Sequence, residues 1–184
     1  MTLSQTIGLW LCCLLAAIAL DAQNQQAAKS LILQPEELLR MELESQSNAA
    51  YIQQIGRHNE VNLQQIQLPD GGTNVAKIQQ DGVDNYALIV QQGGGNQLTL
   101  VQSGHGNAYE LINEAYHNDL LIVQDGNHNT VTQQLINSNR VNVEFVQQGN
   151  NNEIIQVLNG VHARDYKVRQ IGNDLKVIIR QSSF

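Results

Sequence analysis

The sequence predicts an all-β fold, a β-solenoid in which six strand–turn–strand repeats stack into two parallel sheets. Three observations lead to this fold class. A Gln-x-Gly motif recurs six times at a nearly constant spacing, asparagines flank the motif at fixed distances, and the residues between these markers alternate between apolar and polar. A period of about 20 to 50 residues is typical of repeat architectures, in which each unit is one small structural element.

The Gln-x-Gly motif marks the turn of each repeat. Successive glutamines lie 26, 22, 22, 23 and 23 residues apart, and the motif occupies Gln54/Gly56, Gln80/Gly82, Gln102/Gly104, Gln124/Gly126, Gln147/Gly149 and Gln170/Gly172. Asparagine stands three residues after the glycine in the first five copies, at Asn59, Asn85, Asn107, Asn129 and Asn152, and Leu175 replaces it in the sixth. The turn therefore has a nearly constant sequence along the whole array.

Two further amide positions delimit the repeat. Six residues before the glutamine lie Asn48, Asn74, Asn96 and Asn118, replaced by Val141 and Arg164 in the last two copies. Six residues after the second asparagine lie Gln65, Gln91, Asn113 and Gln181, replaced by Leu135 and Leu158 in copies four and five. Each unit reads Asn-x5-Gln-x-Gly-x2-Asn-x5-Gln, and the units start near residues 48, 74, 96, 118, 141 and 164.

Both five-residue stretches of the unit have the period of two that is typical of a β-strand. The inward positions of the first stretch are Ala50/Ile52, Ala76/Ile78, Leu98/Leu100, Leu120/Ile122, Val143/Phe145 and Tyr166/Val168. Those of the second are Val61/Leu63, Ala87/Ile89, Tyr109/Leu111, Val131/Gln133, Ile154/Gln156 and Val177/Ile179. One such arch cannot bury its apolar face alone, so we expect copies to stack with one rung per repeat. At about 4.8 Å per rung, six rungs rise roughly 29 Å.

The amides and the glycine have physical roles in this arrangement. Glycine supplies the backbone freedom that a tight turn requires. The Asn and Gln side chains face inward at the strand ends, where an unpaired amide is costly to bury. Stacked in register, each amide bonds the copies above and below it, as in the amide ladders of cross-β assemblies. The sequence therefore predicts these amides and glycines as the residues that define the stack.

The repeat Asn-x5-Gln-x-Gly-x2-Asn-x5-Gln resembles the curlin repeat, the unit of curli functional amyloid fibres, over residues 48–181. The resemblance implies a subunit that associates with itself and with a second kind of curlin subunit. It also implies export across a Gram-negative outer membrane by dedicated secretion and anchoring machinery, and roles in adhesion and biofilm matrix at the cell surface.

The segment before the array predicts export. Residues 7–20 form an unbroken apolar run that suits the core of a signal peptide, with cleavage after Ala22, although no Lys or Arg precedes the run. A membrane anchor is the alternative. Both cysteines, Cys12 and Cys13, lie in this run, so we expect neither disulfides nor thiol chemistry in the mature chain. Residues 23–47 form a separate segment, either a short helix that starts near Pro35 or a disordered stretch.

The last repeat differs from the others in charge. Residues 164–184 carry five basic residues against Asp165 and Asp174, a net charge of +3, whereas residues 23–163 carry a net charge of −9. A basic, irregular final repeat resembles the minor curlin subunit, which nucleates or anchors fibres. The candidate surface-attachment residues are Arg164, Lys167, Arg169, Lys176 and Arg180. The alternatives are that these basic residues discourage edge pairing or meet the acidic repeats of the next molecule, and that the chain is the major subunit.

The two ends of the array carry the repeat pattern to residues 48 and 181, and we expect no polar cap in the remaining tail, 182–184. An uncapped edge that matches the body of the stack is a template for another molecule. The remaining alternative is a monomeric solenoid that binds a partner or saccharide on one face.

Other function classes find little support. The overall charge of −7 argues against nucleic-acid binding. No Ser/His/Asp arrangement or cysteine cluster predicts catalysis, a cofactor, a small-molecule substrate or a metal site. His58, His105 and His128 fall in the turns, where we expect their side chains to be solvated. The alternative is a weak metal site between His105 and His128.

Overall fold

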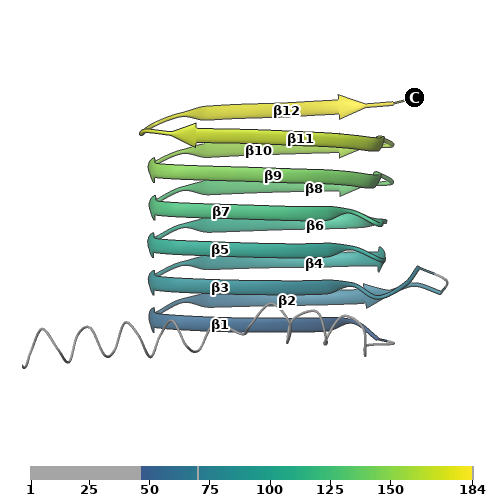
Figure 1. The fold of residues 1–184 in the computed structure, drawn as a ribbon, viewed down its shortest axis with the longest axis horizontal. Coiled ribbons are helices and arrows are strands. Elements are labelled where there is room, and N and C mark those ends of the chain that lie inside the picture. Colours follow the sequence, from purple (N-terminus) through teal and green to yellow (C-terminus); the bar gives the residue numbers. More distant parts are fainter. Residues whose placement is uncertain (1–46, 70, 184) are drawn as a thin grey trace, which may run out of the picture. The chain divides into compact units, whose positions relative to one another are not determined.

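The computed structural model describes residues 47–69 and 71–183, and these residues form twelve β-strands and no helix. The first six strands are β1 (Ala49–Arg57), β2 (Glu60–Gln67), β3 (Val75–Val83), β4 (Tyr86–Gly94), β5 (Gln97–His105) and β6 (Ala108–Tyr116). The last six are β7 (Asp119–Asn127), β8 (Thr130–Ile136), β9 (Asn139–Asn150), β10 (Glu153–Asn159), β11 (His162–Ile171) and β12 (Lys176–Ser182). Figure 1 shows them as a regular stack.

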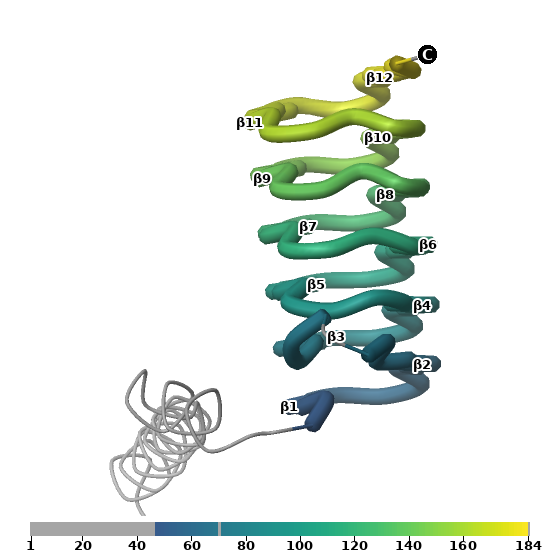
Figure 2. The backbone as a smooth tube through the Cα atoms, turned by 90° about the vertical axis from the view of Figure 1, so that its right-hand side faces the viewer, coloured from purple at the N-terminus to yellow at the C-terminus, as the bar shows by residue number. Residues whose placement is uncertain are grey.

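The strands form two six-stranded sheets, one of the odd-numbered strands and one of the even-numbered strands. Every neighbouring pair is parallel, and each strand pairs with the equivalent strand of the next repeat, as β1 does with β3 and β2 with β4. One odd and one even strand make one rung, so rung 1 is β1 with β2 and rung 6 is β11 with β12. Figure 2 shows the rungs as successive turns of the chain. The predicted β-solenoid is confirmed.

The core lies between the two sheets and consists of the inward residues of rungs 2 to 5. In the first sheet Ala76, Leu98 and Leu120 stack in one column, and in the second Ala87 and Tyr109 do so, all with at most 1% of their surface exposed. The alternation of apolar and polar residues directs one face of each strand into this core. The outward positions carry polar and charged side chains together with a few apolar ones, among them Leu121 and Ile112.

Rungs 1 and 6 differ from the rest because each has a neighbouring rung on one side only. Val61, Leu63, Tyr166, Val168, Val177 and Ile179 pack against the core but are only partly buried. Ile52 of rung 1 remains 43% exposed although its position faces inward. No described residue covers the outer side of either rung.

Two predicted segments, the signal peptide at 1–22 and the segment 23–47 apart from its last residue, lie outside the described residues. Ser182 was expected to begin the tail and is instead the last residue of β12. Ser183 follows it and donates a hydrogen bond through its hydroxyl to the carbonyl of Gly160.

Candidate functional site

A continuous glutamine column runs through all six rungs on the inner face of the first sheet. Each Nε2 donates to the Oε1 of the next rung: Gln54 to Gln80 (2.7 Å), Gln80 to Gln102 (2.8 Å), Gln102 to Gln124 (2.8 Å), Gln124 to Gln147 (3.0 Å) and Gln147 to Gln170 (2.8 Å). The last donor, Gln170 Nε2, bonds the carbonyls of Glu153 and Leu175. Each bond between buried amides contributes about 0.5–1.5 kcal/mol net.

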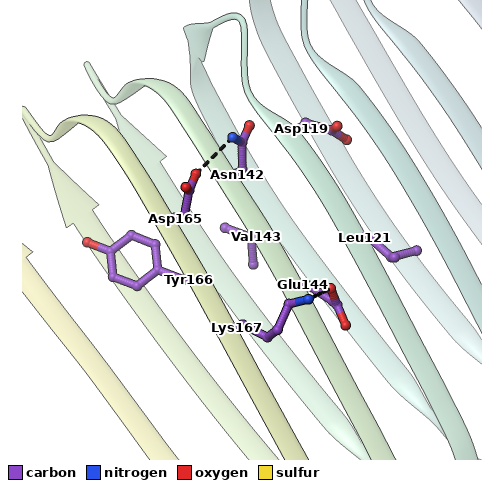
Figure 3. A pocket seen from close by; sticks show the side chains of 8 residues that line it. All are labelled: Asp119, Leu121, Asn142, Val143, Glu144, Asp165, Tyr166 and Lys167. Atoms are coloured by element: carbon purple, nitrogen blue, oxygen red, sulfur yellow. Dashed lines mark hydrogen bonds and ion pairs between the residues drawn. The ribbon is translucent and has the colours of Figure 1, made fainter.

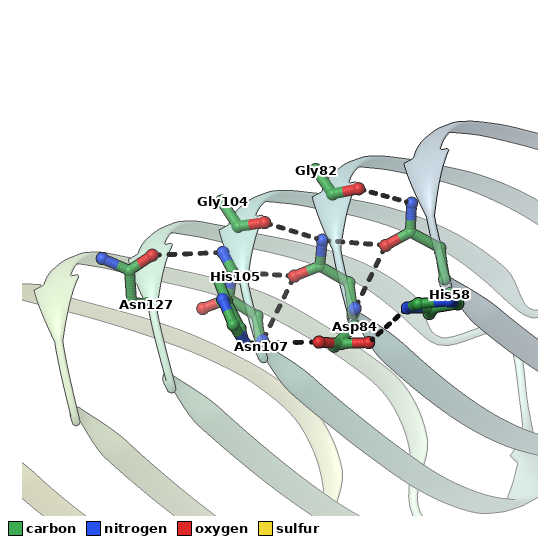
Figure 4. Close-up of polar contacts among 9 residues, drawn as sticks. His58, Gly82, Asp84, Gly104, His105, Asn107 and Asn127 are labelled. Carbon is green, nitrogen blue, oxygen red and sulfur yellow. Dashed lines mark hydrogen bonds and ion pairs between the residues drawn. The ribbon is translucent and has the colours of Figure 1, made fainter.

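An asparagine column lies beside the turn and runs through rungs 1 to 5. Nδ2 donates to Oδ1 of the preceding rung from Asn85 to Asn59 (3.1 Å), Asn107 to Asn85 (3.0 Å), Asn129 to Asn107 (3.0 Å) and Asn152 to Asn129 (3.0 Å). The same Nδ2 donates to a turn carbonyl of the following rung, for example from Asn85 to Gly104 at 3.1 Å. Figure 4 shows Asn107 with the turn residues around it, including Gly82 and Gly104. Each asparagine of rungs 2 to 5 therefore bonds both neighbouring rungs, whereas Asn59 of rung 1 bonds only rung 2.

The two columns donate in opposite directions, and this explains where the last repeat departs from the motif. The glutamine column donates toward rung 6, so rung 6 must provide an acceptor, and Gln170 is retained. Between its side chains the asparagine column donates toward rung 1, so Asn152 donates to Asn129 and needs no side-chain acceptor at the equivalent position of rung 6. Leu175 stands there, and its backbone N–H donates to Asn152 Oδ1 at 3.1 Å.

A second asparagine column starts the first-sheet strands at Asn48, Asn74, Asn96 and Asn118. Each Oδ1 accepts the backbone N–H of the next rung, and the last, Asn118, accepts from Val141 at 2.9 Å. Val141 needs no amide to make this bond, because it contributes only its backbone. Val141 and Arg164 thus replace asparagine in the last two rungs, where Asn118 needs only the backbone N–H of Val141 as a donor.

The amide column at the end of the second-sheet strands is less complete. Gln65 Nε2 donates to Gln91 Oε1 at 2.9 Å. Gln91 is opposite Asn113 in the sheet, but Gln91 Nε2 and Asn113 Nδ2 are buried without a hydrogen-bond partner. Leu135 and Leu158 continue the column, and it ends at Gln181, whose Oε1 accepts from the Tyr166 hydroxyl.

A buried polar chain that the repeat pattern did not explain crosses the second sheet. The Tyr109 hydroxyl donates to Gln133 Oε1 at 2.7 Å, and Gln133 Nε2 donates to Gln156 Oε1 at 2.6 Å. Gln156 Nε2 has no partner, since Ile179 lies opposite it in rung 6. Burial raises the pKa of Tyr109 well above its ordinary value. In the sequence, the sign of this chain was that Gln133 and Gln156 occupy an inward position at which the other four repeats have an aliphatic residue.

The turn glycines lie in one column, Gly56, Gly82, Gly104, Gly126, Gly149 and Gly172, and all have φ between +109° and +132°. A Cβ on any of the first five would lie 1.9 or 2.0 Å from the carbonyl oxygen of the glycine in the next rung. On Gly172 it would meet only Leu175 Cδ1, at 3.7 Å. Glycine is thus required for two reasons, its conformation and the close approach of the following rung.

The turns also contain a column of left-handed residues that the motif did not reveal. His58, Asp84, His128, Asn151 and Asp174 all have φ between +54° and +57°, and Gly106 completes the column. Asn, Asp and His are enriched in this conformation, so the residue types at this position were the available signal. Asp84 of this column contacts His58 Nδ1 of the same column (3.3 Å) and His105 Nε2 of the next turn (3.4 Å), as Figure 4 shows.

The rings of His105 and His128 lie 5.1 Å apart, so the structure does bring these two predicted neighbours together. Within residues 47–69 and 71–183, no group of three or more His, Cys, Asp and Glu side chains is arranged to hold a metal ion.

Two of the five basic candidates in rung 6 pair with the acidic residues of rung 5. Lys167 Nζ lies 2.5 Å from Glu144 Oε2, and Lys176 Nζ lies 2.6 Å from Glu153 Oε2. The first pair borders a shallow hollow of about 390 Å³ on the outer face of the first sheet (Figure 3), where Asn142 also donates to Asp165 at 2.8 Å. The exposed Arg164, Arg169 and Arg180 make no ion pair with any described residue.

Comparisons with known proteins leave the site to be interpreted from its own geometry. No protein-family model matches the chain, and no curated protein is significantly similar to it. In the part of the chain that the structure describes, no helix is long and apolar enough to cross a membrane.

Proposed function

We propose that this protein is the structural subunit of an extracellular, curli-type amyloid fibre, and that it acts by adding its rungs to those of other molecules. One observation carries the proposal. Both end rungs present the inward apolar and amide residues of the repeat, and no described residue covers them. Unpaired strand edges of this kind template the pairing of another chain.

The interior of the stack supports the proposal, because its parallel strands and its hydrogen-bonded amide columns are features that cross-β fibres also have. Every rung repeats the same parallel register, and the side-chain amides bond along the stacking direction. The hollows on the outer faces of the described strands, such as the one at Glu144 and Lys167, are open and shallow, unlike the enclosed cleft with converging polar groups that a small-molecule site usually has. A binding module on one face is therefore the weaker interpretation.

We further propose the minor-subunit role, in which rung 6 nucleates fibres or attaches them to the cell surface. Arg164, Arg169 and Arg180 support it, because none of these three guanidinium groups forms an ion pair with a described residue. Lys167 and Lys176 support it less, since each pairs with the acidic residue of rung 5.

Polymerisation of the purified chain without residues 1–22 tests the fibre proposal. We expect a lag, then fibrils that bind thioflavin T and diffract with the strand spacing of about 4.8 Å along the fibre axis. A chain that remains monomeric for days at tens of micromolar would refute the proposal and leave the monomeric solenoid as the interpretation.

Seeding separates the minor from the major role. If the protein is a nucleator, catalytic amounts abolish the lag of the partner subunit. Deletion of residues 164–184 should then detach fibres from cells more than it impairs polymerisation. Unchanged attachment after this deletion would exclude rung 6 as the anchor.

A further inference from the structure

A second open hollow lies at the edge of the stack opposite the Gln-x-Gly turns. At this edge the chain passes from the even strand of one rung to the odd strand of the next, in segments that we call the rung connections. Residues at the connections after rungs 3, 4 and 5 line a hollow of about 280 Å³: Tyr116, His117, Asn139, Arg140, His162 and Ala163. We propose that this hollow binds the carboxylate group of an acidic saccharide chain. The inference goes beyond the fibre proposal and does not depend on it.

Arg140 supplies the fixed positive charge of the hollow. It is the only Lys or Arg between Lys77 and Arg164, a stretch that holds eight acidic residues. Its side chain is nevertheless exposed and forms no ion pair with any described residue. None of the residues that line the hollow is acidic. A guanidinium group presents paired N–H donors in one plane, which match the two oxygens of a carboxylate. The hollow therefore offers an unpaired cation to one planar anion.

The turn at Arg140 does not itself require an arginine. Arg140 has a φ of +57°, in the left-handed region that is uncommon for residues other than Gly, Asn, Asp and His. Gly95, His117 and Ala163 hold the equivalent position, two residues before the paired start of the next odd strand, and have φ of +70°, +58° and +51°. Three different side chains thus make the same turn. The long cationic side chain of Arg140 is therefore available for a role other than folding.

Further polar groups flank Arg140. Asn139 Oδ1 accepts the backbone N–H of Tyr116 at 2.9 Å, and Asn139 Nδ2 remains as a donor with no described acceptor. His117 and His162 belong to the connections on either side of Arg140, and their side chains form no hydrogen bond with a described residue. The site thus contains hydrogen-bonding groups for sugar hydroxyls beside the cation for the carboxylate.

The longest rung connection holds the Tyr116 ring in place. This connection lies between Gln67 and Val75 and accounts for the longer first spacing of the repeat. A Cβ on its Gly71 would lie 3.0 Å from Tyr116 Cε1 and 3.0 Å from Gly94 Cα. The insertion after rung 1 therefore packs against an aromatic ring that also lines the hollow. An aromatic ring held in this way provides an apolar surface for one face of a sugar ring.

An extended acidic peptide fits this edge less well than a saccharide does. The backbone N–H groups of His117 and Asn139 already donate to the carbonyls of Gly94 and Val161, each at 3.0 Å. These groups are therefore not available for the main-chain hydrogen bonds by which a peptide adds to a sheet. A sugar unit needs only the side chains. The open form of the hollow also suits one unit of a chain that continues past it, whereas an isolated small molecule is usually enclosed.

Fluorescence anisotropy with labelled tetragalacturonate tests the site. The chain is the one used for the polymerisation test, kept dilute enough that no thioflavin signal develops. Unlabelled tetragalacturonate should displace the probe. Its methyl ester, tetraglutamate and inorganic phosphate should each require at least about tenfold higher concentrations, because none combines a carboxylate with a sugar ring.

Arg140→Gly separates binding from folding. Glycine accepts a φ of +57°, so the urea midpoint of the variant should stay close to that of the unmodified chain. Affinity for the probe should fall at least about tenfold, because the paired donors to the carboxylate are lost. Arg140→Lys should give a smaller loss, because it keeps the charge without the planar pair of donors. Arg180→Gln is the matched control: it removes one charge from another unpaired arginine and should change the affinity less than about twofold.

The outcomes separate this inference from the fibre proposal. Selective displacement by tetragalacturonate together with a loss confined to the Arg140 variants supports the site. Equal losses in Arg140→Gly and Arg180→Gln would show a general attraction to basic residues and overturn the inference. Equal displacement by the methyl ester, by tetraglutamate or by phosphate would overturn the assignment to an acidic saccharide, as would the absence of binding at millimolar probe. None of these results affects fibril formation, and a chain that forms no fibrils leaves the site intact.

Discussion

The variant Gly104→Ala measures how much the close contact between two rungs inside the stack contributes to the unfolding free energy. Gly104 has a φ of +111°, and a Cβ on it would lie 2.0 Å from the carbonyl oxygen of Gly126, a distance that real Cβ atoms do not approach. Holding alanine in such a conformation costs about 1–3 kcal/mol. The neighbouring backbone must also move by about 1 Å, which weakens about two sheet hydrogen bonds of about 0.5–1.5 kcal/mol each. We expect a total loss of about 2–6 kcal/mol in unfolding free energy.

Gly172→Ala is the matched control, since it has a comparable φ of +132° and no rung above it. A Cβ there meets only Leu175 Cδ1 at 3.7 Å, an ordinary contact. Only the conformational cost of about 1–3 kcal/mol remains. The difference between the two variants, about 2 kcal/mol, therefore isolates the contact between rungs.

Urea unfolding of the soluble chain, followed by far-ultraviolet circular dichroism, provides the measurement. The chain is kept dilute enough that no thioflavin signal develops. With a slope of about 2 kcal/mol per molar urea, the two midpoints should differ by about 1 M. Equal midpoints would show that the turn glycines serve their conformation alone and would refute the close-contact argument.

Three further predictions concern the buried polar groups. Gln102→Leu should lower the unfolding free energy measured in urea by about 2–4 kcal/mol, because it leaves Gln80 without its side-chain acceptor and Gln124 without its side-chain donor. Gln54→Leu at the open end should cost far less. Equal losses for the two variants would contradict a continuous ladder. Replacing Tyr109, Gln133 and Gln156 together by Phe, Leu and Leu should stabilise the chain by about 1–3 kcal/mol, because the unpaired buried donor Gln156 Nε2 disappears. Each single change should not stabilise it. A destabilised triple variant would contradict this interpretation. Because burial raises the pKa of Tyr109, the folded state retains a proton that the unfolded state releases, so stability should fall as pH rises above about 10. Tyr109→Phe should remove that part of the alkaline loss in a stability–pH profile, and an unchanged profile would refute the assignment.

The sequence by itself determined the number of rungs and the residues that share each column. A repeat with a period of 22 or 23 residues leaves one way to stack equivalent positions, and each amide needs a partner when it is buried. The positions of Gln102, Asn107 and Gly104 in the stack could therefore be predicted without coordinates. The apolar alternation around Leu98 and Leu100 gave the direction of the core for the same reason.

The tertiary structure decided which way each ladder donates. A motif records that Gln170 is present and that Leu175 replaces asparagine, but only the side-chain conformations reveal that one column donates toward rung 6 and the other toward rung 1. It also decided that Lys176 pairs with Glu153, a contact between residues 23 positions apart.

Only the tertiary structure, too, gave the second reason for the turn glycines. Their conformation was predictable from the motif, whereas the approach of Gly126 to Gly104 depends on how closely two rungs are packed. Hydrogen-bond direction and steric contact are properties of neighbouring rungs in space, and a one-dimensional repeat specifies which residues are neighbours without specifying how they meet.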